Sequence, residues 1–259
     1  MRTADKSRHR RFKSSFLVAD RMKESIISSG LAEGDRLPSE KELAETHGYA
    51  RGTVREALRI LEHEDVITVK SGPNGGIFVR RIGSEAVARS LAFLFHLRDV
   101  TVSELITARS ELEAACGYLA ALNASEDNLK KLEGSVQRME EAIGDSERQA
   151  AENLVFHLEV VKASKNTVLQ IILESLQEVM YDPTAHVFYS VDTQKEAVQA
   201  HKKILEAIAN RDSMVAARRI RKHLSVFLRY VLETKQGELL LKPLARFTPT
   251  LSPFSRKRP

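Results

Sequence analysis

Hydrophobic and polar positions follow two different periods along the chain. In most of the sequence apolar residues recur every three or four positions, which is the spacing of one face of an α-helix. Such stripes run over 12–29 and 51–64, and between them Ser39 and Glu42 form a capping-box pair that opens a short helix. The segment VITVKSGPNGGIFVRR alternates instead, around a Gly/Pro/Asn turn, which predicts two short strands. Three helices and a β-hairpin predict a winged helix-turn-helix over 1–81.

The pattern is helical from residue 92 to residue 234, without a strand-like segment. We therefore predict a mainly α protein, with an N-terminal winged helix-turn-helix that carries a small β-hairpin and a C-terminal antiparallel α-helical bundle. A linker is expected over 82–91, and a flexible basic tail with prolines over 235–259. The helices after the hairpin are expected at 85–97, 102–123, 126–143, 147–164, 167–181, 193–210 and 213–234.

Charge is distributed unevenly along the 259 residues, although the net charge is only +5. Residues 1–81 carry 16 Lys+Arg against 12 Asp+Glu, a net of +4. Residues 82–234 carry 18 against 22, a net of −4, and residues 235–259 carry 6 against 1, a net of +5. Basic ends without a strongly amphipathic basic helix favour nucleic acid over a membrane surface as the partner.

The sequence contains no feature of an exported or membrane protein. Its apolar runs are too short for a membrane span, and the basic N-terminus lacks the apolar core of a secretory signal. The single cysteine, Cys116, excludes an intrachain disulfide framework and fits a reducing compartment. We expect a cytoplasmic protein.

Two exposed cations begin the predicted helix over 51–64. Arg51 and Arg55 lie four residues apart on one face, at the helix end where the macrodipole already favours anions. An anion from outside the chain would account for them, because the planar arginine fork can bind a guanine edge or a phosphate. The alternative is a solvated face paired with Glu56 or Glu62.

The segment GDRLPSEKELAETHGYARGTVREALRILEHEDVI, followed by VKSGPNGGIFV, resembles the N-terminal domain of the GntR family of bacterial repressors. The resemblance covers about residues 34–80 and implies binding to double-stranded operator DNA. Lys41 stands where the family usually has arginine, and Ala50 replaces the usual Ser or Thr cap, a loss of about 1 kcal/mol. The DNA-facing set that it implies is Lys41, Arg51, Gly52, Thr53, Arg55 and Gly72, with Gly72 at the tip of the wing.

Three histidines lie on apolar stripes of the helical region. His157, His201 and His223 each point towards the bundle interior, which is costly for an imidazole without a partner. Asn153 precedes His157 by four residues and shares its face. Taken singly, each histidine could be a satisfied core residue. Taken together, they predict one polar site, and three neutral imidazoles suit zinc or nickel.

The segments RSELEAACGYLAA, NLVFHLEVVKASKN and HKKILEAIANRDSMVAARRIRKHL resemble the effector domain of the FadR subfamily within the GntR family. In its metal-binding members an aspartate and three histidines hold a divalent cation beside a small carboxylate effector. The matching positions here are Asn153, His157, His201 and His223. Asn153 removes one negative charge, so metal affinity is expected to fall or the site to be empty, and members without metal also exist.

The same resemblance implies that Arg109 and Asn153 bind the effector. Arg109 matches the arginine of the first effector-domain helix, where a guanidinium could hold a carboxylate. The alternative is an internal ion pair between Arg109 and Glu113.

The function predicted is a ligand-responsive transcriptional regulator that is not an enzyme. We expect a homodimeric repressor that a small organic acid releases from a palindromic operator. Two alternatives come from other classes. One is a metal-dependent enzyme that uses the histidine cluster, although no carboxylate in these motifs is spaced to activate water. The other is a constitutive DNA-binding protein without an effector.

Overall fold

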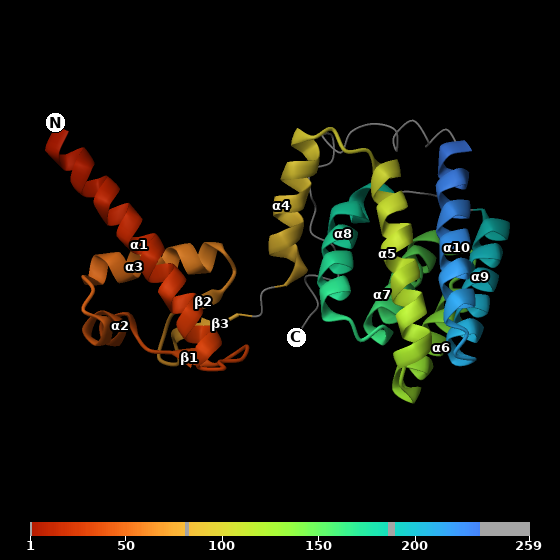
Figure 1. Cartoon of the computed structure of the whole chain (residues 1–259), viewed down its shortest axis with the longest axis horizontal. Helices are drawn as coiled ribbons and strands as arrows, with labels where there is room; N and C mark the ends of the chain where they lie inside the picture. The colour runs from red at the N-terminus through yellow and green to blue at the C-terminus, as the bar shows by residue number, and fades with distance from the viewer. Residues whose placement is uncertain (1, 81–82, 186–189, 234–259) are drawn as a thin grey trace. The chain divides into compact units, whose positions relative to one another are not determined.

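A computed structural model describes residues 2–80, 83–185 and 190–233 of the chain (Figure 1). The expected tail over 235–259 lies outside the described residues. Contacts divide the chain into two compact units, Met1–Ala86 and Val87–Pro259, and each is described by itself.

The first unit is the predicted winged helix-turn-helix with one additional strand. Its sheet is antiparallel with the order β1-β3-β2, and the predicted hairpin is confirmed as β2 and β3. The additional strand β1 pairs Leu37 with Ile77, and at two residues it was too short to show any alternation in the sequence. The elements are α1 (Arg2–Ser28), β1 (Arg36–Leu37), α2 (Glu40–His47), α3 (Arg51–His63), β2 (Ile67–Lys70) and β3 (Gly76–Val79).

The core of this unit joins α1 to α3 and the sheet. Val18 and Met22 of α1 pack with Leu61 of α3 and with Ile67 and Ile77 of the strands. Helix α1 begins at Arg2, ten residues before the predicted start at residue 12. The apolar period marks only the packed part of a helix, so the sequence pattern missed this polar first part.

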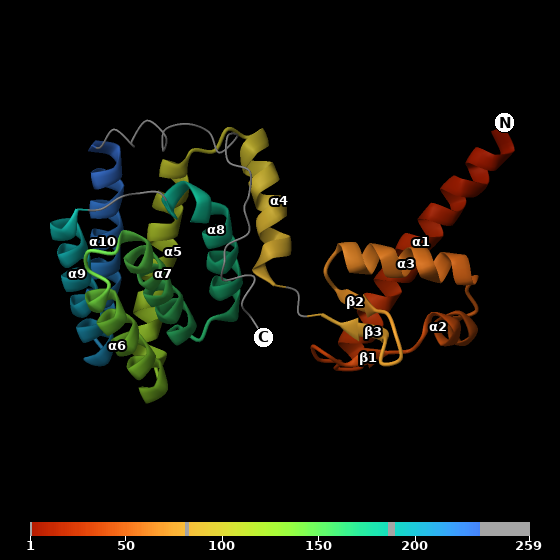
Figure 2. The same ribbon diagram turned by 180° about the vertical axis from the view of Figure 1, so that it is seen from behind.

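The second unit is the predicted helical bundle, with seven helices in its described part. Helix α5 contacts α7, α8, α9 and α10, while α4 and α8 lie on one side of it and α9 and α10 on the other in both views (Figure 1, Figure 2). Within the described residues, no helix is both long and apolar enough to cross a bilayer. The helices are α4 (Ser84–Leu97), α5 (Val102–Asn123), α6 (Glu126–Glu141), α7 (Ser146–Ala163), α8 (Thr167–Ala185), α9 (Val191–Ala209) and α10 (Ser213–Glu233).

Most of the expected linker over 82–91 lies within α4. This helix begins at Ser84, and its Ala88 is buried in a cluster with Leu105 and Met180 of the bundle. The Gly83–Ser84 pair suggested a loop, but Ser84 is the first residue of the helix.

A glycine sets the distance between α5 and α10. A Cβ atom on Gly117 would overlap Cδ1 of Ile220, so the two helices can approach this closely only because residue 117 has no side chain. Helix α5 also has a well-defined start, because Thr101 and Glu104 form a capping box. The position of α5 matters because Arg109 and Glu113 lie on it, and Glu113 contacts His157 of α7.

Candidate functional site

The structure brings the three predicted histidines together inside the bundle. His157 lies on α7, His201 on α9 and His223 on α10, and one ring nitrogen of each lies within 4.8 Å of those of the other two. Nε2 of His201 is 2.9 Å from Nε2 of His223. His157 and His201 are buried and His223 is half-buried. The site exists because α7, α9 and α10 all pack on α5.

Burial favours the neutral imidazole at two of the three histidines in this cluster. It holds the pKa of His201 well below its ordinary value. It also lowers the pKa of His223 to about 3. A neutral imidazole is the form that binds a metal, so no proton would need to leave these two rings at neutral pH.

A buried carboxylate orients the third histidine. Nδ1 of His157 lies 2.5 Å from Oε2 of Glu113, which also forms an ion pair with Arg109 one turn earlier on α5. Burial alone would raise the pKa of Glu113, but the charge of Arg109 and the hydrogen bond with His157 lower it to about 2, so the group is ionised. An ionised carboxylate accepts the proton on Nδ1 and leaves Nε2 of His157 as the free acceptor.

These groups fit a divalent metal ion. Nε2 of His157 is buried and has no hydrogen-bond partner among the described residues, which is unusual for a buried nitrogen. Around a protein-bound metal, a histidine that binds the ion through one ring nitrogen usually donates a hydrogen bond from the other nitrogen to a carboxylate or a similar acceptor. Asn153 lies one turn before His157 on α7 and is half-buried.

Glu113 is not among the residues that the sequence predicts for this site, because the sequence indicates it only as a partner for Arg109. The structure contains that ion pair, the alternative considered for Arg109. Arg109 is itself buried, and its Nη2 atom has no hydrogen-bond partner among the described residues. One signal in the sequence could have placed Glu113 inside the bundle. It lies four residues after the oppositely charged Arg109, and the positions on either side of it in the chain are apolar.

At the start of α3 both predicted arginines are exposed. Arg55 forms two hydrogen bonds with Glu40, at 2.9 and 3.2 Å, and Arg51 lies 3.9 Å from Glu45. Both glutamates lie on α2, whereas the alternative of a solvated face had Glu56 or Glu62 as the partner. Exposed ion pairs are worth about 0–1 kcal/mol, so both arginines remain available to a stronger anion.

The other predicted contacts around α3 differ in exposure. Lys41 is exposed on α2 and Gly52 is half-buried, whereas Thr53 is only 9% exposed and lies on the packed side of α3. Ala50 is the N-cap and makes no side-chain cap, and the first turn contains no acidic residue. Neither the cap nor the first turn of this helix therefore supplies a group that compensates its positive end, as in helices that bind phosphate.

The tip of the wing needs two glycines, of which only Gly72 is predicted from the sequence. Gly72 is exposed with φ +102°, a conformation that favours glycine. Gly75 donates its N–H to Gly72 at 2.8 Å, and a Cβ at Gly75 would overlap Gly72 and Lys70. Arg36 binds the carbonyl of Gly75 at 3.0 Å and braces the turn from β1.

Comparisons with known proteins agree with both units. Residues 17–79 match the family described as bacterial regulatory proteins, gntR family, and residues 104–226 match the FCD domain. The chain is 30% identical over 225 residues to the Uxu operon transcriptional regulator of Escherichia coli (strain K12), which covers 83% of this chain and 86% of that protein. It is 27% identical over 219 residues to the Glc operon transcriptional activator of the same strain, covering 80% and 84%.

A solved structure has the same fold over most of its length. Streptococcus agalactiae GntR superposes with a TM-score of 0.64 at 25% identity, covering 83% of this chain and 99% of that one. The chain therefore belongs to the gntR family of bacterial regulatory proteins, and it joins that family's winged-helix domain to an FCD domain, which corresponds to the effector-binding domain of FadR-like regulators.

Proposed function

We propose that the first unit binds a palindromic operator and that a small carboxylate, bound at the histidine cluster of the second unit, releases it. The observation that carries this proposal is the convergence of His157, His201 and His223 on one buried site beside the Arg109–Glu113 pair. The relatives reported above are transcription regulators and not enzymes, so the metal-dependent enzyme alternative has no support. Since the target is the chromosome, the protein would act in the cytoplasm.

DNA contact would come from α3 and the wing. Arg51 and Arg55 project from the first turns of α3, where their planar forks can bind guanine O6 and N7 or clamp a phosphate. Lys41 from α2 would add a phosphate contact, and Gly52 leaves room for the DNA backbone. Gly72 would bring the wing close to the adjacent groove. The low exposure of Thr53 leaves it the weakest member of the predicted set.

In the helical unit His157, His201 and His223 would hold a zinc or nickel ion, with Asn153 as a neutral fourth ligand. Such an ion supplies positive charge and open coordination positions for a carboxylate. The free Nη2 of Arg109 would contribute a charge-assisted hydrogen bond to the same ligand. Because Asn153 lacks the charge of an aspartate, the ion would be held less tightly than in a relative with aspartate there.

A homodimer would match a two-fold symmetric operator, since one winged helix offers few base contacts. Apolar side chains exposed on the helical unit support this proposal. Phe93 and Leu97 on α4 are 65% and 61% exposed, and Val168 on α8 is 66% exposed. Light scattering should report twice the chain mass of 29.1 kDa, and a monomer that remained monomeric on operator DNA would contradict this part of the proposal.

Control by the effector requires that the ligand bind one arrangement of the dimer better than the other. One relative is named as an activator, so the direction of control must be measured and not assumed. A palindrome selected from random DNA would be labelled and its affinity followed by fluorescence anisotropy with acetate, L-lactate or succinate. We expect at least one of them to weaken binding by the zinc-loaded protein and to have no effect on His201→Ala. If none of a broad carboxylate panel changed the affinity of either protein, the constitutive alternative would be correct.

A further inference from the structure

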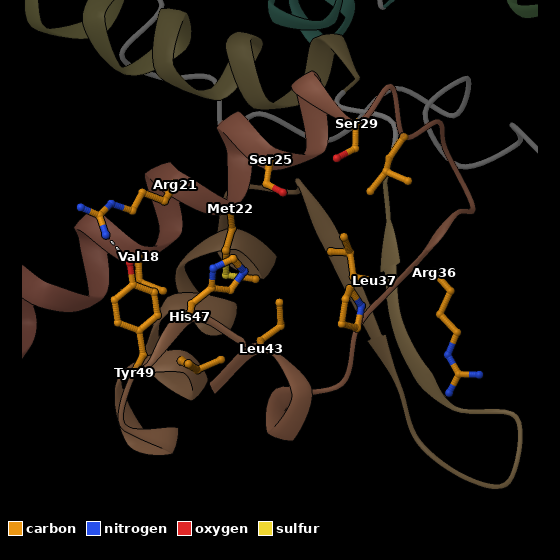
Figure 3. A pocket seen from close by; sticks show the side chains of 13 residues that line it. Val18, Arg21, Met22, Ser25, Ser29, Arg36, Leu37, Leu43, His47 and Tyr49 are labelled. Atoms are coloured by element: carbon orange, nitrogen blue, oxygen red, sulfur yellow. Dashed lines mark hydrogen bonds between the residues drawn. The ribbon is translucent and has the colours of Figure 1, made fainter. Parts of the chain in front are cut away.

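The winged-helix unit contains a pocket of its own, separate from the histidine cluster. It has a volume of about 310 Å³ and lies between α1, β1 and α2 (Figure 3). Its apolar wall comes from Met22 of α1, Leu37 of β1 and Leu43 of α2, and all three side chains also pack in the core of the unit. A volume of this size is at the lower end of what small-molecule sites in proteins have.

Two guanidinium groups and no carboxylate line this pocket. Arg21, Arg36 and His47 line it, and none of its lining residues is Asp or Glu. The Arg21 guanidinium donates a hydrogen bond to the Tyr49 hydroxyl, and it forms no ion pair with a carboxylate among the described residues. An apolar wall beside two guanidinium groups, with no carboxylate in the lining, is complementary to a ligand that has an apolar body and one negative group.

We propose that this pocket binds a small amphipathic carboxylate, with its apolar part against Met22, Leu37 and Leu43 and its carboxylate on Arg21. Operator DNA could supply an anion to the same guanidinium, but a phosphate would leave the apolar wall uncovered. The apolar lining therefore favours a free organic acid over a nucleic-acid phosphate.

The pocket also adjoins the turn that positions α3. His47 and Tyr49 stack on each other, with ring centroids 6.1 Å apart, on either side of Gly48, whose φ of +67° ends α2. Arg51 follows Tyr49 by two residues. A carboxylate that takes Arg21 away from Tyr49 would remove a contact that holds this turn, and would change the presentation of the first residues of α3. This second step rests on the proposed DNA-binding function, whereas binding to the pocket does not.

Binding can be tested with 3-phenylpropionate as the probe, on the full chain by amide NMR. We expect saturable shifts at Leu43, His47 and Tyr49. The matched neutral compound, 3-phenylpropanamide, should bind about tenfold more weakly or worse, because it lacks the charge that Arg21 recognises. Acetate, which lacks the apolar body, should produce no saturable shift at these three residues. Equal affinity for acid and amide, or shifts confined to the helical unit, would overturn the proposal.

A pair of serines on α1 provides matched variants. Ser25 lines the pocket (Figure 3). Ser28 does not line it, and both serines are exposed on the same helix. Ser25→Phe should fill the pocket and abolish the shifts, whereas Ser28→Phe should leave them unchanged. Arg21→Met should remove the preference for the acid over the amide. If Ser25→Phe bound the probe as well as Ser28→Phe did, the pocket would not be the site.

The same variants distinguish this site from the proposed function. If 3-phenylpropionate weakens operator binding, Ser25→Phe should lose that response while His201→Ala keeps it. A response that His201→Ala abolishes and Ser25→Phe retains would instead belong to the helical unit. Binding without any effect on the operator would keep the pocket as a ligand site and overturn only its coupling to α3.

Discussion

The carboxylate of Glu113 lies 2.5 Å from Nδ1 of His157, although 44 residues separate them in the chain. The contact crosses from α5 to α7 and is buried on both sides, with exposures of 3% and 2% for the two side chains. It determines which nitrogen of His157 remains free to face His201 and His223. The chemistry of the histidine cluster therefore depends on a residue that is not one of its three histidines.

Glu113→Gln should weaken metal retention by about 10- to 100-fold, which is the usual cost of losing the carboxylate behind a ligating histidine. An amide can donate to Nδ1 as well as accept from it, so the tautomer is no longer determined. Competition with a chromogenic chelator would measure the affinity, and circular dichroism would confirm folding. Glu111→Gln on the same helix is the control, because Glu111 is exposed and pairs with Arg221 at 2.9 Å. Retention equal to that of the control would show that Glu113 has only a structural role.

Asn153→Asp should tighten metal retention, because it restores a charged oxygen one turn before His157. His201→Ala should abolish retention, since it removes one of three imidazoles. Elemental analysis of protein purified without a histidine tag, before and after mild chelation, measures both effects. Asn210→Asp makes the same change of charge at the exposed end of α9 and should have no effect. If Asn210→Asp tightened metal retention as much as Asn153→Asp did, the gain would be a general charge effect, and Asn153 would not belong to the site.

Arg51→Ala and Arg55→Ala should each weaken operator binding by about 1–3 kcal/mol if the arginine binds a base edge. Lys41→Ala should cost less, because a lysine phosphate contact is a single point charge. Anisotropy titrations at fixed salt would give the affinities. Arg59→Ala is the control on the same helix, since Arg59 is exposed and lies 3.4 Å from Glu56. Losses no larger than that of Arg59→Ala would mean that the two arginines form only a solvated face.

The single thiol should be unreactive in the folded protein. Burial raises the pKa of Cys116 to about 11, although a hydrogen bond with Ser164 acts in the opposite direction. Because the thiolate is the reactive form, a disulfide reagent at pH 8 should label the unfolded chain rapidly and the folded chain hardly at all. Labelling of the native protein should rise only as the pH approaches 11. Rapid native labelling at pH 8, with the fold intact, would show that Cys116 is accessible.

Gly117→Ala should destabilise the helical unit by about 1–3 kcal/mol, because the added methyl group meets Ile220 between α5 and α10. Gly134→Ala on α6 is the matched substitution. Its Cβ would meet only the end of the Arg138 side chain, at 3.3 Å, and a helical alanine is worth about 0.5–1 kcal/mol over glycine. The midpoint of chemical denaturation should therefore fall for Gly117→Ala and rise for Gly134→Ala. A stabilising Gly117→Ala would show that α5 and α10 can separate at no cost.

Local patterns in the sequence determined most of the secondary structure and the faces of its helices. The capping box of Ser39 and Glu42 and the Gly-rich turn of the wing act over a few residues, so both could be predicted without the fold. The apolar stripes also indicated that His157, His201 and His223 point inward, since a helix repeats its faces every 3.6 residues. The resemblance to a known family then indicated which inward residues form one site.

Only the tertiary structure decided which residues meet across elements. Periodicity assigns a residue to a face but not to a partner, so it could not identify Glu113 as the group behind His157, Glu40 as the partner of Arg55, or Leu37 as a strand residue paired with Ile77. The pocket beside Arg21 arises in the same way, from three elements whose spacing depends on the packing of α1 on the rest of its unit. Each of these contacts depends on the distance and angle between packed elements, and those are set by the shapes of many side chains at once.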